Sequence, residues 1–172
     1  SDLFTDIKGC ASGQLQIKGN PEKPDLLGKI SLRNAGLLVN YTQVYYTIDS
    51  AEIKFEEDGI NIGEIEVKDK YLNKGLVKGK LYEKGFSNMT FDFDMSTEKL
   101  LLIDTKLKDN ENFYGRAIGK ATMNLKGPES AAKMTLVAEA NDSSHIYIPN
   151  SYSRESGDAD FIVFKEYETE MT

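Results

Sequence analysis

Apolar and polar residues alternate with a period of two along most of this chain. The clearest run covers residues 89–95, where Met and Phe occupy the odd positions and Thr and Asp the even positions. Alternate residues of a β-strand point to opposite faces of the sheet. The pattern therefore predicts strands with one apolar and one polar face, and it places Leu101 and Ile103 on the same inward face as the odd positions of this run.

Turn-forming residues separate the alternating runs. Asp58-Gly59 lies between two short apolar runs and predicts a β-hairpin. We expect about ten to twelve strands, paired with their neighbours in the chain into a mostly antiparallel all-β meander. The other turn signals are Gly19-Asn20-Pro21, Lys84-Gly85, Lys108-Asp109-Asn110, Gly127-Pro128 and Asn141-Asp142-Ser143.

Two segments depart from ordinary strands. Residues 115–125 place glycine and alanine, then Met123 and Leu125, on one face. Glycine weakens a strand interior, so this pattern indicates curvature or the close approach of another group, and it leaves room on the inner side. Residues 69–79 combine an acidic residue with Gly-x-Val-x-Gly, which we interpret as a turn leading into a bent strand.

The composition argues against several classes of function. The 172 residues carry a net charge of −7, with one cysteine (Cys10) and one histidine (His145). A negative chain without a basic face does not fit nucleic-acid binding, and no catalytic or metal-binding motif is present. Asp92 and Asp94 share a face, as expected on a solvated strand. We therefore expect a protein that is not an enzyme, with no cofactor, metal or nucleic-acid partner.

Eight short segments of alternating apolar residues and glycine follow one another at a distinctive spacing. They are Gly28–Ala35, Leu38–Tyr41, Tyr46–Ile48, Ile53–Phe55, Ile65–Asp69, Lys74–Gly79, Phe113–Ala117 and Gly119–Ala121. Each segment alone is degenerate, but in their order and spacing, from about residue 13 to residue 149, they resemble the C-terminal region of the TamB/AsmA-like envelope proteins of Gram-negative bacteria.

This resemblance implies a fold and a role. Members of the family resemble a gutter, which is a β-sheet folded over along its length like a taco. The resemblance therefore implies an open or half-closed barrel with an apolar concave face. It implies location in the periplasm and an inner-membrane anchor elsewhere in the full-length protein. It also implies work beside an outer-membrane barrel partner in outer-membrane biogenesis, through phospholipid transport across the periplasm, outer-membrane protein assembly, or both. We expect residues 1–172 to be one β domain of a larger envelope protein, contacting adjacent segments of that protein, with residues 165–172 as a frayed tail.

The expected ligands are phospholipid acyl chains in the concave groove. Two alternatives remain from the sequence: a structural β-module with a filled core, and a closed barrel that binds a small apolar molecule. The candidate groove-lining residues are Leu15, Ile17, Ile30, Leu32, Ile53, Phe55, Ile65, Val67, Val77, Phe91, Phe93, Leu101, Ile103, Ala117, Ala121, Met123, Leu125, Met134 and Leu136.

Overall fold

The computed structural model describes residues 4–84, 87–147 and 162–169, and the side chains of residues 4–83 and 89–147. The described residues form strands and one short 3-10 turn, Glu129–Ala131. The strands are β1 (Phe4–Asn20), β2 (Lys23–Val39), β3 (Val44–Glu56), β4 (Gly59–Lys68), β5 (Lys74–Lys84), β6 (Ser87–Thr105), β7 (Tyr114–Pro128), β8 (Ala132–Ala140), β9 (His145–Tyr147) and β10 (Ile162–Thr169).

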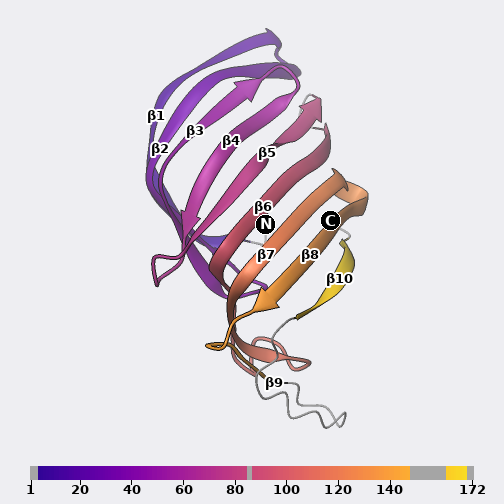
Figure 1. The fold of residues 1–172 in the computed structure, drawn as a ribbon. Helices are drawn as coiled ribbons and strands as arrows, with labels where there is room; N and C mark the ends of the chain where they lie inside the picture. Colours follow the sequence, from indigo (N-terminus) through magenta and orange to yellow (C-terminus); the bar gives the residue numbers. More distant parts are fainter. Residues whose placement is uncertain (1–3, 85–86, 148–161, 170–172) are drawn as a thin grey trace.

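The strands form one antiparallel sheet in the order β1-β2-β3-β4-β5-β6-β7-β8-β10, and β9 pairs with β7 beyond the end of β8 (Figure 1). Eight of the ten strands thus follow one another in space as they do in sequence. The predicted all-β antiparallel meander is confirmed. β3 and β4 form the hairpin predicted at Asp58-Gly59, with Glu56 opposite Gly59. Gly85 of the turn signal Lys84-Gly85 lies outside the described residues.

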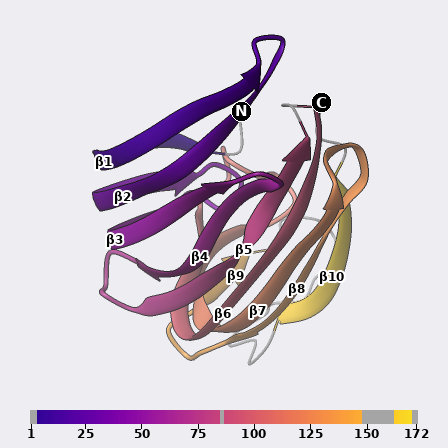
Figure 2. The ribbon, with the colours of Figure 1, turned by 90° about the horizontal axis from the view of Figure 1, so that it is seen from above.

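The sheet curls on itself without closing. Viewed along the curl, β1 and β10 lie at its two margins (Figure 2), and these strands do not pair with each other. A curled sheet buries its apolar face without a second layer. The expected open gutter is therefore confirmed, and the alternative of a closed barrel is wrong.

Short interruptions in the alternation help the strands to bend. Pairs of consecutive exposed residues occur in β2 (Arg33-Asn34), β3 (Asp49-Ser50), β4 (Gly63-Glu64) and β6 (Glu98-Lys99). The backbone is left-handed at Asn34 and Gly63, and the β6 pairing with β7 shifts between Thr97 and Leu100. Such bulges increase local twist and bend a strand. After each one, the inward face passes from even to odd positions or the reverse.

The described core has two clusters. The main cluster contains six buried residues from β4, β6, β7 and β8: Ile65, Val67, Leu100, Leu102, Ala121 and Ala138. The second, smaller cluster contains Val44, Leu101 and Ile118. The sequence prediction put Leu101 on the inward face with Ile103. Leu101 is 2% exposed in the second cluster, and Ile103 packs against the main cluster, to which Leu100 and Leu102 belong.

The end of the chain also differs from the expectation. Residues 165–169 were expected to fray, but they belong to β10 and pair with β8, with Lys165 opposite Leu136 and Thr169 opposite Ala132. Residues 170–172 lie outside the described part of the chain.

Candidate binding groove

The register of the sheet joins apolar residues into continuous rows across its concave face. One row crosses seven strands, from β1 to β7, and a second crosses five, from β4 to β8. The first consists of Leu15, Gly28, Phe55, Ile60, Leu81, Phe91 and Gly127. The second consists of Ile65, Val77, Met95, Met123 and Leu136.

The next row along the strands is polar throughout and lies on the convex face. Because neighbouring residues of a strand face opposite sides, these rows assign an apolar and a polar face to the sheet from β1 to β8. The polar row consists of Gln14, Lys29, Lys54, Asn61, Lys80, Asp92, Lys126 and Lys133.

The candidate residues differ in burial along the groove. Ile65, Val67, Leu101, Ala117 and Ala121 are buried, and Leu15 and Ile17 on the margin strand are 39% and 73% exposed. The remaining candidates are half-buried. Four of them pack against the main cluster, namely Ile53, Val77, Ile103 and Leu136. The others are Ile30, Leu32, Phe55, Phe91, Phe93, Met123, Leu125 and Met134. The concave face thus changes from a packed floor to an open apolar surface towards β1.

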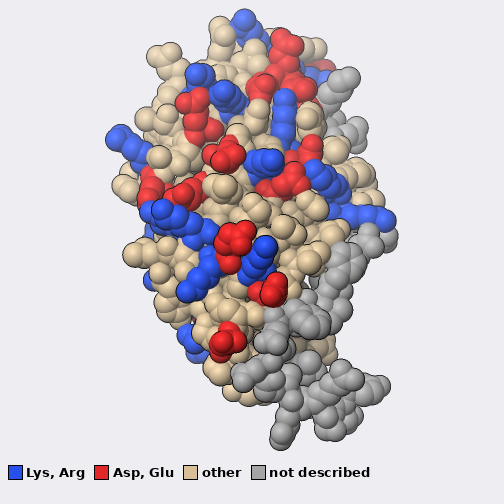
Figure 3. Space-filling view, in the orientation of Figure 1, with Lys and Arg blue, Asp and Glu red and all other residues tan. Residues whose placement is uncertain are grey.

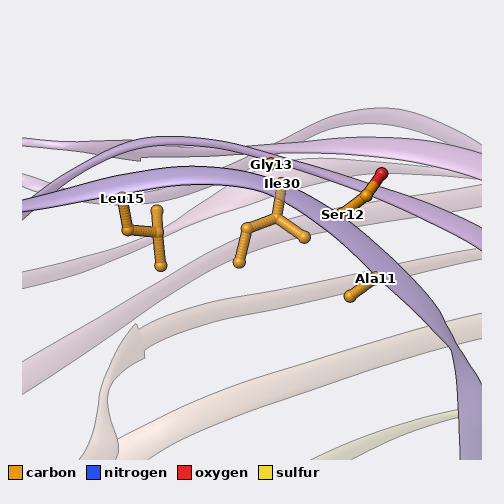
Figure 4. Close-up of a pocket in the computed structure, with 5 residues that line it drawn as sticks. All are labelled: Ala11, Ser12, Gly13, Leu15 and Ile30. Carbon is orange, nitrogen blue, oxygen red and sulfur yellow. The ribbon is translucent and has the colours of Figure 1, made fainter.

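A shallow open pocket of about 350 Å³ lies on β1 and β2 near the exposed margin. Leu15, Ile30 and Ala11 point to the same side of the two strands, whereas Ser12 points to the other (Figure 4). Gly13 lies opposite Ile30 and adds no side chain. This part of the groove combines apolar walls with free space, as an acyl chain requires.

The small side chains of β7 do not leave the expected room inside the curl. Ala117 and Ala121 are 0% and 2% exposed, and Ala121 belongs to the main cluster. A Cβ atom built on Gly119 would lie 1.9 Å from the carbonyl oxygen of Glu139. The expectation of close approach is confirmed, because the backbone of the neighbouring strand β8 lies against Gly119. The expectation of open space is wrong, because Ala117 and Ala121 are buried.

One end of the groove is closed by contact between β3 and β6. β4 ends at Lys68, which lies opposite Thr47 of β3, and β5 begins at Lys74. Neither strand therefore reaches as far as the start of β3 at Val44. The Tyr46 hydroxyl donates a hydrogen bond to the Leu101 carbonyl at 2.7 Å, and the Asp104 amide donates to the Thr42 carbonyl at 2.8 Å. β3 and β6 therefore meet beyond the β4–β5 loop.

The buried carboxylate of Asp69 anchors that loop. It is 2% exposed, and its Oδ2 accepts hydrogen bonds from the Leu101 amide at 2.7 Å and the Asn73 side chain at 2.9 Å. Its Oδ1 accepts from the amides of Tyr71 at 2.8 Å and Asn73 at 3.0 Å. Buried charge requires such partners. The turn predicted at the start of residues 69–79 is confirmed, and Asp69 ties it to β6.

The same contact changes the acidity of a tyrosine. Burial, and secondly the charge of Asp69, raise the pKa of Tyr46 above its ordinary value. Both effects disfavour the phenolate. Tyr46 therefore remains a hydrogen-bond donor at the closed end.

The convex face carries interspersed charges (Figure 3). Lys126 pairs with Asp92, and with Asp94 at 3.2 Å; hydrogen bonds to these two carboxylates raise the pKa of Lys126. Lys80 pairs with Asp58 in the same way. The Asp92 and Asp94 pair thus takes part in cross-strand ion pairs on a solvated surface, as the sequence indicated.

Neither the histidine nor the cysteine belongs to a described reactive cluster. Cys10 is exposed on β1 and His145 is exposed on β9. Among the described residues, no group of three or more His, Cys, Asp and Glu side chains is placed to hold a metal ion. The described residues also include no helix with the length and apolarity needed to cross a membrane.

Sequence alternation missed several residues of the concave face. Leu100 and Leu102 were not among the candidates, although the charged pair Glu98-Lys99 in front of them interrupts the alternation. Tyr46 packs against both clusters, and its position depends on the contact between β3 and β6. The first signal is local and could have been used. The second is not, because β3 and β6 are far apart in sequence.

The geometry is that of an apolar groove, packed at one end, open towards β1, and charged on its outer side. No family model, curated protein or solved structure matches this chain.

Proposed function

We propose that this chain is a non-enzymatic segment of a TamB-like envelope protein whose concave groove holds phospholipid acyl chains during outer-membrane biogenesis. The observation that carries the proposal is the uncovered part of the concave face, where half-buried apolar side chains follow one another in register from strand to strand. An exposed apolar surface of this extent indicates a ligand or partner. On this proposal, the full-length protein is periplasmic, anchored in the inner membrane, and works with an outer-membrane barrel protein.

The physical chemistry of the two faces supports an acyl ligand. The concave rows contain side chains that offer no hydrogen bonds to a ligand, such as Phe91 and Phe93, whose ring centroids lie 6.2 Å apart. Burying a methylene group contributes about 0.8 kcal/mol. An acyl chain that lies along these rows would gain this energy without any polar recognition, as suits a conduit for many lipids.

Photo-crosslinking tests the proposal with a matched pair of aromatic positions. Phe93 lies on the concave face, and Tyr82, 39% exposed, lies on the convex face of the neighbouring strand. Benzoylphenylalanine is placed at either position, and the protein is irradiated with liposomes of phosphatidylethanolamine and phosphatidylglycerol. We expect lipid adducts, detected by mass spectrometry, to be at least about tenfold more abundant at position 93 than at position 82. Equal yields, or no adduct at position 93 in a folded protein, would contradict the proposal.

A second candidate function is a structural β-module. The main cluster favours it, since six buried residues fill the curl between β4 and β8. A module of this kind binds no lipid and survives delipidation unchanged. In that case, organic extraction of the purified chain yields no phospholipid, and position 93 yields no adduct.

A further inference from the structure

The margin strand β1 has an unpaired edge. Its 17 residues are all exposed, and it pairs with β2 on one side and with no described strand on the other. An unpaired edge presents amide and carbonyl groups that can pair with another strand. β1 is also long for a strand, which makes this edge the largest free pairing surface in the described part of the chain.

Two isoleucines make this edge unusual. Ile7 and Ile17 are 71% and 73% exposed. The β1–β2 pairing shifts between Thr5 and Cys10, so the face of Ile7 follows from its neighbour Lys8. The Lys8 ammonium lies 5.2 Å over the ring of Tyr45, on the side of the sheet opposite to Tyr46 and the core, and Ile7 therefore faces the core side, as Ile17 does. Ile17 lies opposite Leu26 and Ala11 opposite Leu32, so this face is the concave one. Each isoleucine would be covered if a further strand continued the sheet.

We propose that two copies of this chain associate through β1, antiparallel, about a twofold axis at Ser12. In this register Ile7 lies opposite Ile17 of the second copy, and Asp6 lies opposite Lys18 of the second copy. Each contact occurs twice. Neither Asp6 nor Lys18 has an ion-pair partner within the described part of the chain. Cross-strand apolar and opposite-charge pairs are the stabilising contacts of a sheet.

The charges select this register among its neighbours. The two concave faces lie on the same side only if residues of the same face are opposite each other. Centring the axis on Gly13 instead places Lys8 opposite Lys18, which is a repulsive pair, and centring it on Ala11 places Asp6 opposite Gln16. Only the axis at Ser12 combines attractive charges with paired isoleucines.

The association joins the open ends of two grooves into one apolar surface. The pockets on β1 and β2 of the two copies would then be neighbours, and the packed ends would lie outermost. This inference concerns the edge of the sheet and does not rest on lipid binding. It can hold or fail independently of the proposed function.

Sedimentation equilibrium of the purified chain gives the first test. We expect a concentration-dependent species of twice the 19.2 kDa mass of the chain. Lys18→Glu should weaken the association at least about tenfold, because it creates two like-charge contacts with Asp6. The double variant Asp6→Lys with Lys18→Glu should restore it, since the opposite charges are then exchanged. Loss without this rescue would overturn the register.

Disulfide trapping gives the second test. In the proposed register Gln14 lies opposite Cys10 of the second copy, at the 4.5–5.5 Å Cα separation of antiparallel pairs, which a disulfide spans. Gln14→Cys should therefore form a covalent dimer on oxidation. Gln16→Cys, the matched control on the same face, should cross-link to Cys10 at least about tenfold less.

Three results would overturn the proposal. A chain that stays monomeric and does not cross-link would show that the edge of β1 does not pair two copies. Open-ended oligomers would show that β1 pairs with β10 of the next copy. Equal cross-linking of Gln14→Cys and Gln16→Cys would show that the copies meet without a fixed register.

Discussion

The buried carboxylate of Asp69 offers a sharp test of how the closed end is held together. Its two oxygens accept four hydrogen bonds, three of them from backbone amides, and one of these amides, that of Leu101, belongs to β6. Asp69→Ala removes both carboxylate oxygens at once. The β4–β5 loop keeps its two backbone hydrogen bonds between Asp69 and residues 72 and 73, but it loses the side-chain bonds to Tyr71 and Asn73 and its attachment to β6.

The magnitude follows from the groups left without partners. The Leu101 amide is buried, and a buried amide without an acceptor costs about 1–3 kcal/mol. The amides of Tyr71 and Asn73 are partly buried, and each loses a bond whose net contribution is about 1 kcal/mol. We therefore expect Asp69→Ala to lower the free energy of unfolding by about 3–5 kcal/mol, a large share of the stability of a domain.

Urea denaturation followed by circular dichroism measures this loss. Asp94→Ala is the matched control, because Asp94 also carries a carboxylate, but its partner is Lys126 and its side chain is 37% exposed on the convex face. Exposed ion pairs contribute about 0–1 kcal/mol. If Asp69→Ala costs no more than the control, with an unchanged denaturant slope, the hydrogen bonds of Asp69 do not hold the closed end and the reasoning is refuted.

Further changes test other parts of the fold. The pKa of Tyr46 is raised above its ordinary value of 10.0, so this tyrosine ionises first in the unfolded state. Its contribution to the free energy of unfolding is therefore constant below about pH 10 and falls above it by about 1.4 kcal/mol per pH unit. Tyr46→Phe should reduce this slope in urea titrations. Leu100→Ala should cost about 2–5 kcal/mol in the same assay, and Phe93→Ala, at a half-buried position, about 1–2 kcal/mol; equal costs would mean that both sites are packed alike. Gly119→Ala should cost more than about 2 kcal/mol because its Cβ meets backbone, whereas Gly63→Ala, with nothing within 4 Å and a φ of +61°, should cost about 1 kcal/mol; the reverse order in thermal melts would contradict the close approach of β7 and β8.

The free edge of β1 also bears on solubility. Proteins that keep an edge strand exposed usually protect it with charge, proline or a bulge. β1 has a left-handed residue at Asp6 and lysines at positions 8 and 18, but Ile17 remains exposed between them. The association through β1 would remove this liability by pairing the edge.

The sequence by itself determined the class of fold. Side chains alternate along β6 from Met89 to Met95 because strand geometry repeats every two residues, and this local rule needs no knowledge of the partner strands. The turn signals are equally local, since glycine, proline and aspartate act on the backbone where they stand. Strand content, the antiparallel meander and the polarity of the two faces could therefore be predicted.

The tertiary structure decided which residues line the groove and where it is open. A bulge inserts one extra residue and reverses the face of everything that follows. The charged pair Glu98-Lys99 marks the place of the bulge in β6 locally, but the clusters that Leu100 and Leu101 join depend on the pairing of β6 with β7 and on its contact with β3. The burial of Asp69 and Ala117 depends on strands that are distant in sequence, as does the pairing of β10. Contacts of this kind arise only when the curled sheet brings those strands together, and no local pattern records them.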